Sequence, residues 1–356
     1  MTFKVVHVLS SLHRINFGIW NAAIFGARKL RDDRGIDTAA LICTSRTEVP
    51  PEMDIPTIFV TPEESVKAGD ILTQSGFPGS ETIVVTHGSW LAPARIGNRL
   101  KAAGYRWIYS PHGMLEDWSL RNQRLKKYVY WNLRERWMID HCDLIRAVSK
   151  AEKINLERKL KRKVALIENG VVTPDGIRKT SAVVVYLFLA RLHHKKGILP
   201  LVQAWRMVNA NDDTVKLVIA GPDEGELQPI TPFLTGNIEY VGPVYGDAKR
   251  KLLNDASYYV LPSHSEGFPT SVLEAMSYGG IPLISEGCNF PEVFKQQLGY
   301  RVEPNVDSIG QVLRKLKGVP FDEQQSMRNR TYVDENYSEN KIVDDLYKMY
   351  SSMMAR

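Results

Sequence analysis

Cysteine is scarce in this sequence and long hydrophobic runs are absent. The three cysteines, Cys43, Cys142 and Cys288, are widely separated, which gives neither a disulfide framework nor a metal-ligand spacing. We expect them to be small buried apolar side chains. The longest apolar run, residues 182–190, is shorter than the ~20 residues that a membrane-spanning helix needs. The first residues predict a strand rather than a signal peptide. We therefore expect a cytoplasmic protein.

The remaining composition is that of an ordinary globular protein. The chain has 356 residues, of which 44% are hydrophobic and 24% charged, and domains typically hold ~100–200 residues, so we expect two. Strand-like segments alternate with helical ones, such as 19–31 and 124–139, on both sides of a polar, turn-rich linker at 171–181. This pattern predicts an α/β fold of two doubly wound, Rossmann-like domains facing across a cleft, with ligands at the carboxyl ends of the strands. The strand candidates are 3–11, 38–44, 82–88, 106–113, 144–149, 164–170, 182–192, 215–224, 238–244, 256–263 and 281–286.

The positive charge is concentrated in the first half of the chain. Residues 1–175 carry 26 Lys and Arg against 19 Asp and Glu, whereas the rest carries 20 against 21. The segment 121–137 mixes basic residues with Tyr128, Trp131 and Trp137. Such a composition is typical of a helix on an anionic membrane surface, and equally of a solvated helix whose aromatics face the domain core. Without a zinc-finger or RNP-type motif, we do not expect nucleic acid as a partner.

The stretch SHSEGFPTSVLEAMSYGG, residues 263–280, contains Glu266 and Glu274 around a loop that leads into a helix near Ser271. A helix amino terminus presents unpaired N–H groups that suit a phosphate, and Gly267 would allow a ligand close to the backbone. A carboxylate accepts hydrogen bonds from a sugar diol. The alternative is structural, since Ser271 and Glu274 also have the spacing of a capping box.

Two cations mark the end of the strand candidate at 182–192, with Arg191 in its last residues and Lys196 just after it. Arg191 and Lys196 stand in ARLHHKKG, at the same predicted rim as the glutamates. Two cations beside a helix amino terminus indicate a site for a diphosphate. The alternative is a pair of solvated strand-end charges. His193 and His194 are adjacent, which is not a metal-ligand spacing, so we interpret them as loop residues.

These segments together resemble a known family. ARLHHKKG (190–197), AGPDEGEL (220–227), GPVYGDAKRKLLNDA (242–256) and PSHSEGFPTSVLEAMSYGGIPLIS (262–285) are similar to motifs of family four of the retaining glycosyltransferases, which have the GT-B fold. SPHGMLEDW (110–118) and IENGVV (167–172) also resemble that family. The resemblance covers most of the chain and is strongest at 186–293.

The resemblance implies an organisation and a role for each matching residue. Residues 1–175 would bind the acceptor, 176–336 would bind a nucleotide-sugar donor, and 337–356 would form a helix crossing back to the first domain. Glu274 would bind the donor ribose, Glu266 and His112 would contact the donor sugar, and Asn169 with Gly170 would match the interdomain turn. Gly18 would also bind the donor, but it stands alone where relatives carry a glycine pair that approaches the phosphate or the acceptor, which puts that geometry in question. His87 is either structural or an acceptor contact. Further donor contacts would come from Arg191 and Lys196 at the diphosphate, Gly267, Phe268, Pro269 and Thr270 at the sugar and diphosphate, and the main chain near Val244 at the base.

The expected reaction follows from the resemblance and from these charges. The resemblance implies transfer of a hexose from a nucleotide diphosphate sugar to a saccharide acceptor with retention of configuration. Arg191, Lys196 and the helix amino terminus would stabilise the leaving group. Since no Asp-x-Asp follows an apolar strand, we expect no metal and no other cofactor.

The acceptor and the alternatives stay open at this stage. The basic, aromatic first half favours a lipid-linked saccharide in cell-surface polysaccharide biosynthesis, with the protein peripheral at the inner face of the membrane. The alternative is a catalytically silent scaffold of the same fold that binds a nucleotide sugar or carbohydrate. A nucleotide-sugar epimerase is a third possibility, and sugar transfer would distinguish it.

Overall fold

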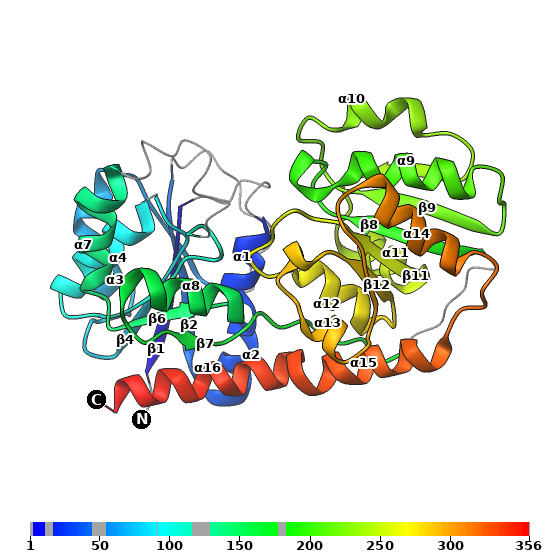
Figure 1. The fold of residues 1–356 in the computed structure, drawn as a ribbon. Coiled ribbons are helices and arrows are strands. Elements are labelled where there is room, and N and C mark those ends of the chain that lie inside the picture. Colours follow the sequence, from blue (N-terminus) through cyan, green and yellow to red (C-terminus); the bar gives the residue numbers. More distant parts are fainter. Residues whose placement is uncertain are drawn as a thin grey trace. The chain divides into compact units, whose positions relative to one another are not determined.

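The computed structural model describes residues 3–10, 17–44, 55–90, 92–115, 129–176 and 183–355. The chain divides into two compact units (Figure 1). Unit 1 holds Met1–Gly170 with Glu339–Arg356, and unit 2 holds Val171–Ser338. The division thus lies slightly before the predicted boundary at 175. Each unit contains a parallel sheet, which confirms the predicted α/β class.

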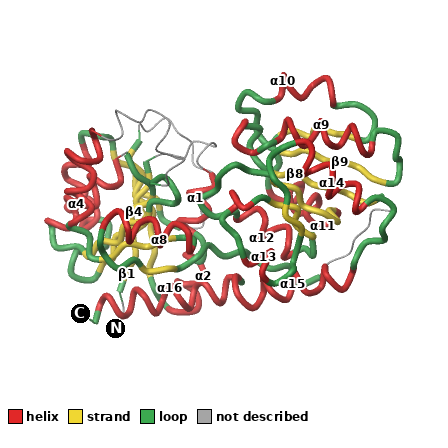
Figure 2. The backbone as a smooth tube through the Cα atoms, viewed as in Figure 1, coloured by secondary structure: helices red, strands yellow, loops and turns green. Residues whose placement is uncertain are grey.

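Unit 1 is built on a seven-stranded sheet in the order β3-β2-β1-β4-β5-β6-β7. Helices cover it, as in a doubly wound fold (Figure 2). Strands β1, β2 and β4 are almost entirely buried, and this explains their continuous apolar sequences. The strands are β1 (Lys4–Leu9), β2 (Asp37–Cys43), β3 (Thr57–Val60), β4 (Thr82–His87), β5 (Arg106–Ser110), β6 (Leu144–Ala147) and β7 (Ala165–Leu166).

The helices of unit 1 include the last helix of the chain. Helix α16 (Glu339–Met354) buries Ile342, Leu346 and Tyr350 in the same core cluster as Phe3 and Ile83. The other helices are α1 (Phe17–Ile24), α2 (Ala27–Arg34), α3 (Ala68–Gln74), α4 (Ala92–Ala102), α7 (Arg136–Asp140) with a preceding π-helical turn at Trp131–Glu135, and α8 (Lys150–Leu160).

Unit 2 is built on a six-stranded parallel sheet in the order β10-β9-β8-β11-β12-β13. Helices α9 and α14 pack against each other, as do α12 and α15. The strands are β8 (Val184–Leu189), β9 (Val215–Ala220), β10 (Ile238–Gly242), β11 (Ala256–Leu261), β12 (Ile281–Ile284) and β13 (Tyr300–Arg301). The helices are α9 (Ile198–Asn209), α10 (Leu227–Ile230), α11 (Gly246–Asp255), α12 (Thr270–Ser277), α13 (Glu292–Lys295), α14 (Val306–Leu316) and α15 (Glu323–Tyr337).

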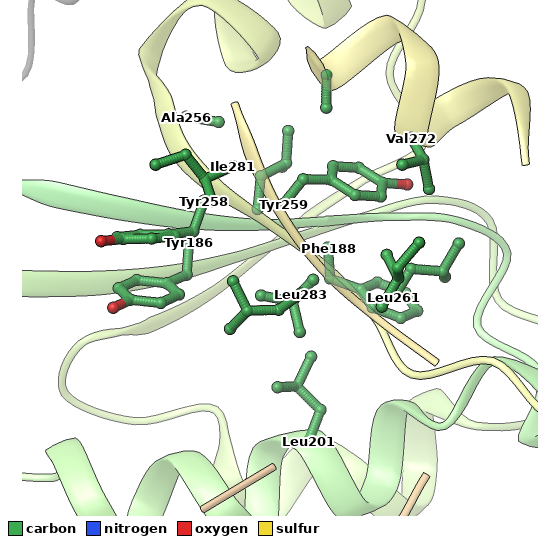
Figure 3. Close-up of a cluster of buried hydrophobic side chains, with 14 of the residues drawn as sticks. Tyr186, Phe188, Leu201, Ala256, Tyr258, Tyr259, Leu261, Val272, Ile281 and Leu283 are labelled. Carbon is green, nitrogen blue, oxygen red and sulfur yellow. The ribbon is translucent and has the colours of Figure 1, made fainter. Parts of the chain in front are cut away.

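The core of unit 2 fills both faces of its sheet. Figure 3 shows Leu201 of α9 on one side of the strands and Val272 of α12 on the other. The rings of Tyr186 and Tyr258 stack at 4.5 Å between centroids, on the neighbouring strands β8 and β11. Close packing on both faces holds the strand ends, and therefore their loops, in fixed positions.

The structure differs from the prediction at three elements. Strands β3 and β13 were not predicted, because four residues and two residues are too few to show a period. The predicted helix at 19–31 is two helices, α1 and α2, separated at Gly26, which has φ 76°. A Cβ there would lie 2.4 Å from Cγ2 of Val343, so the close approach of α16 requires glycine. Cys43, Cys142 and Cys288 are buried and free, as predicted.

Candidate functional site

The predicted donor-site residues of unit 2 lie in loops at one edge of its sheet. Arg191 follows β8, Val244 follows β10 and Glu266 follows β11. Because these strands are parallel members of one sheet, their carboxyl ends share one edge. The structure therefore brings together segments that are far apart in the sequence.

The loops after β8 and β11 are joined by hydrogen bonds. The backbone N–H of His264 donates to the carbonyl of Lys195 at 2.8 Å, and Oγ of Ser263 donates to the same oxygen at 3.1 Å. Gly197, in the first of these loops, has φ 68°. A Cβ there would lie 2.2 Å from the carbonyl oxygen of Pro262 in the second loop. Only glycine combines this conformation with this approach, so Gly197 fixes Lys196 beside the second loop.

Lys196 and Glu266 form the most buried ion pair of this edge. Nζ of Lys196 lies 2.6 and 2.7 Å from the two carboxylate oxygens of Glu266. Each side chain is only 12% exposed. Two hydrogen bonds fix the backbone of Glu266. Its N–H donates to the carbonyl of Gly287, and its carbonyl accepts from the side chain of Asn289. Two residues that were predicted to bind the donor, Lys196 and Glu266, thus form an ion pair with each other.

The other charged residues are also paired with opposite charges. Nη1 of Arg191 donates to both oxygens of Glu224, at 2.7 and 2.8 Å, while Arg191 stays 43% exposed. Nζ of Lys249, on α11, lies 2.7 Å from Glu274 on α12. Sequence reasoning missed Glu224 and Lys249. Glu224 is the last residue of the strand candidate 215–224, which was a usable signal, whereas only the packing of α11 on α12 places Lys249.

The capping interpretation of Ser271 and Glu274 is wrong. Helix α12 begins at Thr270 and has no side-chain cap. Oγ of Ser271 instead lies 2.7 Å from the hydroxyl of Tyr259. The carboxylate of Glu274 is therefore not used by the helix backbone. Phe268 and Pro269 are half-buried and buried, and Phe268 packs on Phe290 and Tyr337, which anchors the loop before the helix.

In unit 1, His112 lies in the loop after β5 in an uncommon backbone conformation. Its φ is 54°, and Gly113 follows with φ 75°. The buried carboxylate of Glu152 accepts from the N–H of Gly113 at 2.5 Å and from that of Val148 at 2.8 Å. A non-glycine residue with positive φ persists only where its surroundings hold it, and Glu152 supplies that support. Sequence reasoning did not find Glu152.

His87 contacts His112 rather than standing alone. Nδ1 of His87 lies 2.8 Å from Nε2 of His112, and Nε2 of His87 lies 3.0 Å from Nδ1 of His7. Burial, with the Arg146 guanidinium nearby, lowers the pKa of His7 and His112 to about 3. Burial and the neighbouring histidines hold the pKa of His87 well below its usual value. All three rings are therefore neutral at pH 7.

Asn169 and Gly18 have different surroundings. Oδ1 of Asn169 accepts from buried Arg146, which also donates to the carbonyl of Ile167. Gly18 lies in α1, and its proposed role stays a prediction. The proposed contact of the main chain near Val244 with a base also stays a prediction.

The basic segment is only partly described, since 121–128 lies outside the described residues. Trp131 packs towards the core, with its ring 6.0 Å from that of Trp90. Val129, Leu133 and Trp137, spaced four residues apart, are instead 46%, 78% and 60% exposed. The prediction that the aromatics face the core therefore fits Trp131 but not Trp137.

In the described part of the chain, no three His, Cys, Asp or Glu side chains are grouped to hold a metal ion. Within the same residues, no helix combines the length and apolarity needed to cross a membrane.

Two glycosyltransferase families match different parts of the sequence. Residues 176–333 match Glycosyl transferases group 1, and residues 82–174 match Glycosyltransferase Family 4. Together the matches span more than half of the chain. The chain therefore belongs to glycosyltransferase family four.

Known proteins agree with this assignment. A phosphatidylinositol N-acetylglucosaminyltransferase subunit of Arabidopsis thaliana is 23% identical over 262 residues, which cover 70% of this chain and 58% of that protein. The N,N'-diacetylbacillosaminyl-diphospho-undecaprenol alpha-1,3-N-acetylgalactosaminyltransferase of Campylobacter jejuni is 33% identical over 107 residues, 29% of this chain and 27% of that one. The chain thus spans little more than half of the first relative's length.

A solved structure shows the same fold. The crystal structure of Anabaena HepE in complex with UDP and glucose has a TM-score of 0.73 to this chain at 14% identity, covering 98% of this chain and 100% of that one. This likeness identifies the fold as GT-B and confirms that prediction.

Proposed function

We propose that this protein is a retaining, metal-independent hexosyltransferase that moves a sugar from a nucleotide diphosphate sugar to a saccharide acceptor. The observation that carries the proposal is the group of three ion pairs at one sheet edge of unit 2, Arg191–Glu224, Lys196–Glu266 and Lys249–Glu274. A family member with no donor to bind would have little use for three cations, two on loops and Lys249 on α11, at a parallel sheet edge, where such folds bind ligands.

The pairing of Lys196 suggests how the donor would bind. A diphosphate offers Lys196 a stronger partner than one carboxylate, because it carries more negative charge and more acceptor oxygens. When Lys196 turns to the diphosphate, the oxygens of Glu266 become available to accept hydrogen bonds from sugar hydroxyls. Arg191 would act on the diphosphate in the same way, and Glu274 would accept from the ribose diol.

The proposed chemistry needs charge stabilisation more than it needs a covalent step. Cleavage of the glycosidic bond develops negative charge on the diphosphate, and Lys196 and Arg191 are positioned cations for that charge. The leaving phosphate then takes the proton of the acceptor hydroxyl as it attacks from the same face, so configuration is retained. Glu266 and His112 would position the sugar, and the cations would take the place of a metal ion.

For the acceptor we propose a lipid-linked saccharide, in assembly of a cell-surface polysaccharide at the inner face of the membrane. The Campylobacter relative is named for a diphospho-undecaprenol substrate, and the Arabidopsis relative for phosphatidylinositol. The exposed residues Val129, Leu133 and Trp137, beside Arg134 and Arg136, form a surface suited to an anionic bilayer.

A thermal-shift screen with UDP, GDP, ADP, CMP and dTDP tests the donor site. A ligand at ~100 times its Kd adds ~2.7 kcal/mol of stability. We expect one nucleotide to stabilise the wild type, and Lys196→Ala and Glu274→Gln to reduce the shift. Lys216→Ala is the matched control, because Lys216 pairs with Glu239 near the opposite end of β9 and should leave the shift unchanged.

The second stage is transfer from the matching sugar nucleotides to a short polyprenyl diphosphate saccharide, with the anomeric configuration of the product read by NMR. Retention supports the proposal, and inversion contradicts it. Nucleotide binding without transfer to any acceptor would favour the scaffold alternative. Transfer that disappears with EDTA would contradict metal independence.

A further inference from the structure

Three histidines of unit 1 come from three neighbouring strands. His7 is on β1, His87 ends β4 and His112 follows β5, and these strands are adjacent in the sheet. In the parallel register, His7 lies opposite Val85, two residues before His87, and His87 lies opposite Ser110, two residues before His112. A step of two residues keeps side chains on the same face. The register thus explains why the three rings meet.

The rings form one chain of hydrogen bonds. Nδ1 of His7 is 3.0 Å from Nε2 of His87, and Nδ1 of His87 is 2.8 Å from Nε2 of His112. The centroids of neighbouring rings are 5.2 and 5.1 Å apart. His7 and His87 are each 3% exposed, whereas His112 is partly exposed. Only the outermost ring of the chain can therefore meet a ligand from solvent.

The chain leaves two proton arrangements. A neutral imidazole carries one N–H, and one of its nitrogens donates while the other accepts. If the bonds point towards His112, all three rings carry the proton on Nδ1. If the bonds point towards His7, all three carry it on Nε2. In both cases the rings share one tautomer, and Nδ1 of His112 is left as either a donor or an acceptor for a ligand.

The charged groups around the chain favour neutral rings. Arg146 is 2% exposed and is held by the carbonyl of Ile167 and by Asn169. Its charge and the burial of the rings both lower their pKa values. Glu152, which holds the loop at Gly113, is the other buried charged residue near His112. Because the rings stay neutral, only the two shared-tautomer arrangements satisfy both hydrogen bonds.

We propose that His7 and His87 are positioning residues whose two hydrogen bonds fix the ring orientation of His112 and tie its tautomer to their own. His112 then meets a ligand through Nδ1 as a neutral ring, in the tautomer that the whole chain shares. The tautomer assignment stands on the geometry of unit 1, and its effect on sugar transfer rests on the proposed function. This gives a role to two buried histidines that make no contact with a substrate.

Nitrogen-15 NMR of histidine-labelled protein at pH 7 tests the tautomers without any substrate. Two-bond couplings show which ring nitrogen carries the proton, and single substitutions assign the signals among the eight histidines. We expect His7, His87 and His112 to show the same tautomer. Two different tautomers among the three, or a doubly protonated ring, would overturn the proposal.

Two substitutions at His7 separate the hydrogen bond from packing. His7→Leu fills the space but cannot bond to His87, so we expect His112 to populate both tautomers. His7→Asn places an amide near the position of Nδ1, and an amide can donate or accept, so we expect it to restore one tautomer. Thr86→Val is the control for the loss of a buried hydrogen bond. Thr86 accepts a hydrogen bond from the indole N–H of Trp107, on the face of β4 opposite to His87.

Kinetics with UDP-glucose, UDP-N-acetylglucosamine and GDP-mannose then measure the effect on transfer. A lost positioning bond should lower kcat on the order of twofold to tenfold in His7→Leu, with donor Kd unchanged and with recovery in His7→Asn. An unchanged His112 signal in His7→Leu refutes the positioning role. A shared tautomer in a wild type that transfers no sugar supports the hydrogen-bond chain and refutes the proposed function instead.

Discussion

Glu266→Gln should strengthen the binding of a nucleoside diphosphate even though it removes a residue of the donor site. In the ligand-free protein both oxygens of Glu266 lie within 2.7 Å of Nζ of Lys196. A diphosphate must compete with this carboxylate for the cation. Glutamine keeps the shape of the side chain but loses the charge, so Lys196 becomes available.

The magnitude follows from the burial of the pair. Exposed ion pairs contribute ~0.2–1 kcal/mol, and removing one partner of a fully buried pair costs ~3–5 kcal/mol. Lys196 and Glu266 are each 12% exposed, which lies between these cases. Relief of about 1–2 kcal/mol corresponds to a Kd lowered roughly fivefold to thirtyfold. Without ligand, the variant should be less stable, because Lys196 loses its partner.

Titration calorimetry with the nucleoside diphosphate that stabilises the wild type measures this effect. Glu286→Gln is the matched control, because Glu286 also forms an ion pair, with Arg301, but its side chain is 63% exposed. The Kd of the nucleotide for this variant should equal that for the wild type. Sugar transfer should fall in Glu266→Gln even as nucleotide affinity rises. Weaker or unchanged nucleotide binding in Glu266→Gln would falsify the competition between carboxylate and diphosphate.

Three further predictions concern stability and the membrane. Gly197→Ala should cost at least ~1–3 kcal/mol and abolish the nucleotide thermal shift, whereas Gly318→Ala, with φ 71° and open space, should cost about 1 kcal/mol in urea unfolding and spare the shift. The pKa of His7 is about 3 in the folded chain, against 6.5 for an unperturbed histidine. The unfolded chain therefore binds a proton at a pH where the folded chain does not. His7 should therefore lower the free energy of unfolding by about 1 kcal/mol as the pH falls from 7.5 to 5.5, with no such loss at higher pH. In His7→Asn, this part of the pH dependence of tryptophan-monitored urea unfolding should disappear, and its persistence would contradict the assignment. Leu133→Ser should reduce flotation of the protein with anionic liposomes but not with neutral ones. Met207→Ser, at another exposed apolar position, should leave flotation unchanged. If the wild type does not float with either kind of liposome, the membrane proposal is wrong.

Much of the fold could be predicted because it depends on local patterns. Continuous apolar runs such as 184–189 and 256–261 are buried on both faces of a parallel sheet. The turn-rich stretch near 171 marks the change between units. Short strands such as β13 could not be predicted, because only pairing with β12 makes those two residues a strand.

The candidate site was predictable as a set of loops but not as a set of partners. Parallel strands place the loops of Arg191, Glu266 and Val244 at one edge, and this follows from strand order alone. The pairing of Lys249 with Glu274 depends instead on how α11 packs against α12. The capping interpretation failed because α12 begins at Thr270, before Ser271, and the hydroxyl of Ser271 bonds Tyr259 on β11 instead.

The sequence by itself determined the two parallel α/β units, the strand-end loops and the kinds of charge that they carry, because hydrophobic period and turn chemistry are local properties. Only the tertiary structure decided that Lys196 meets Glu266 and that His7, His87 and His112 form one chain. Both depend on strand register and loop approach over separations of 25 to 80 residues, and no local pattern encodes such a register.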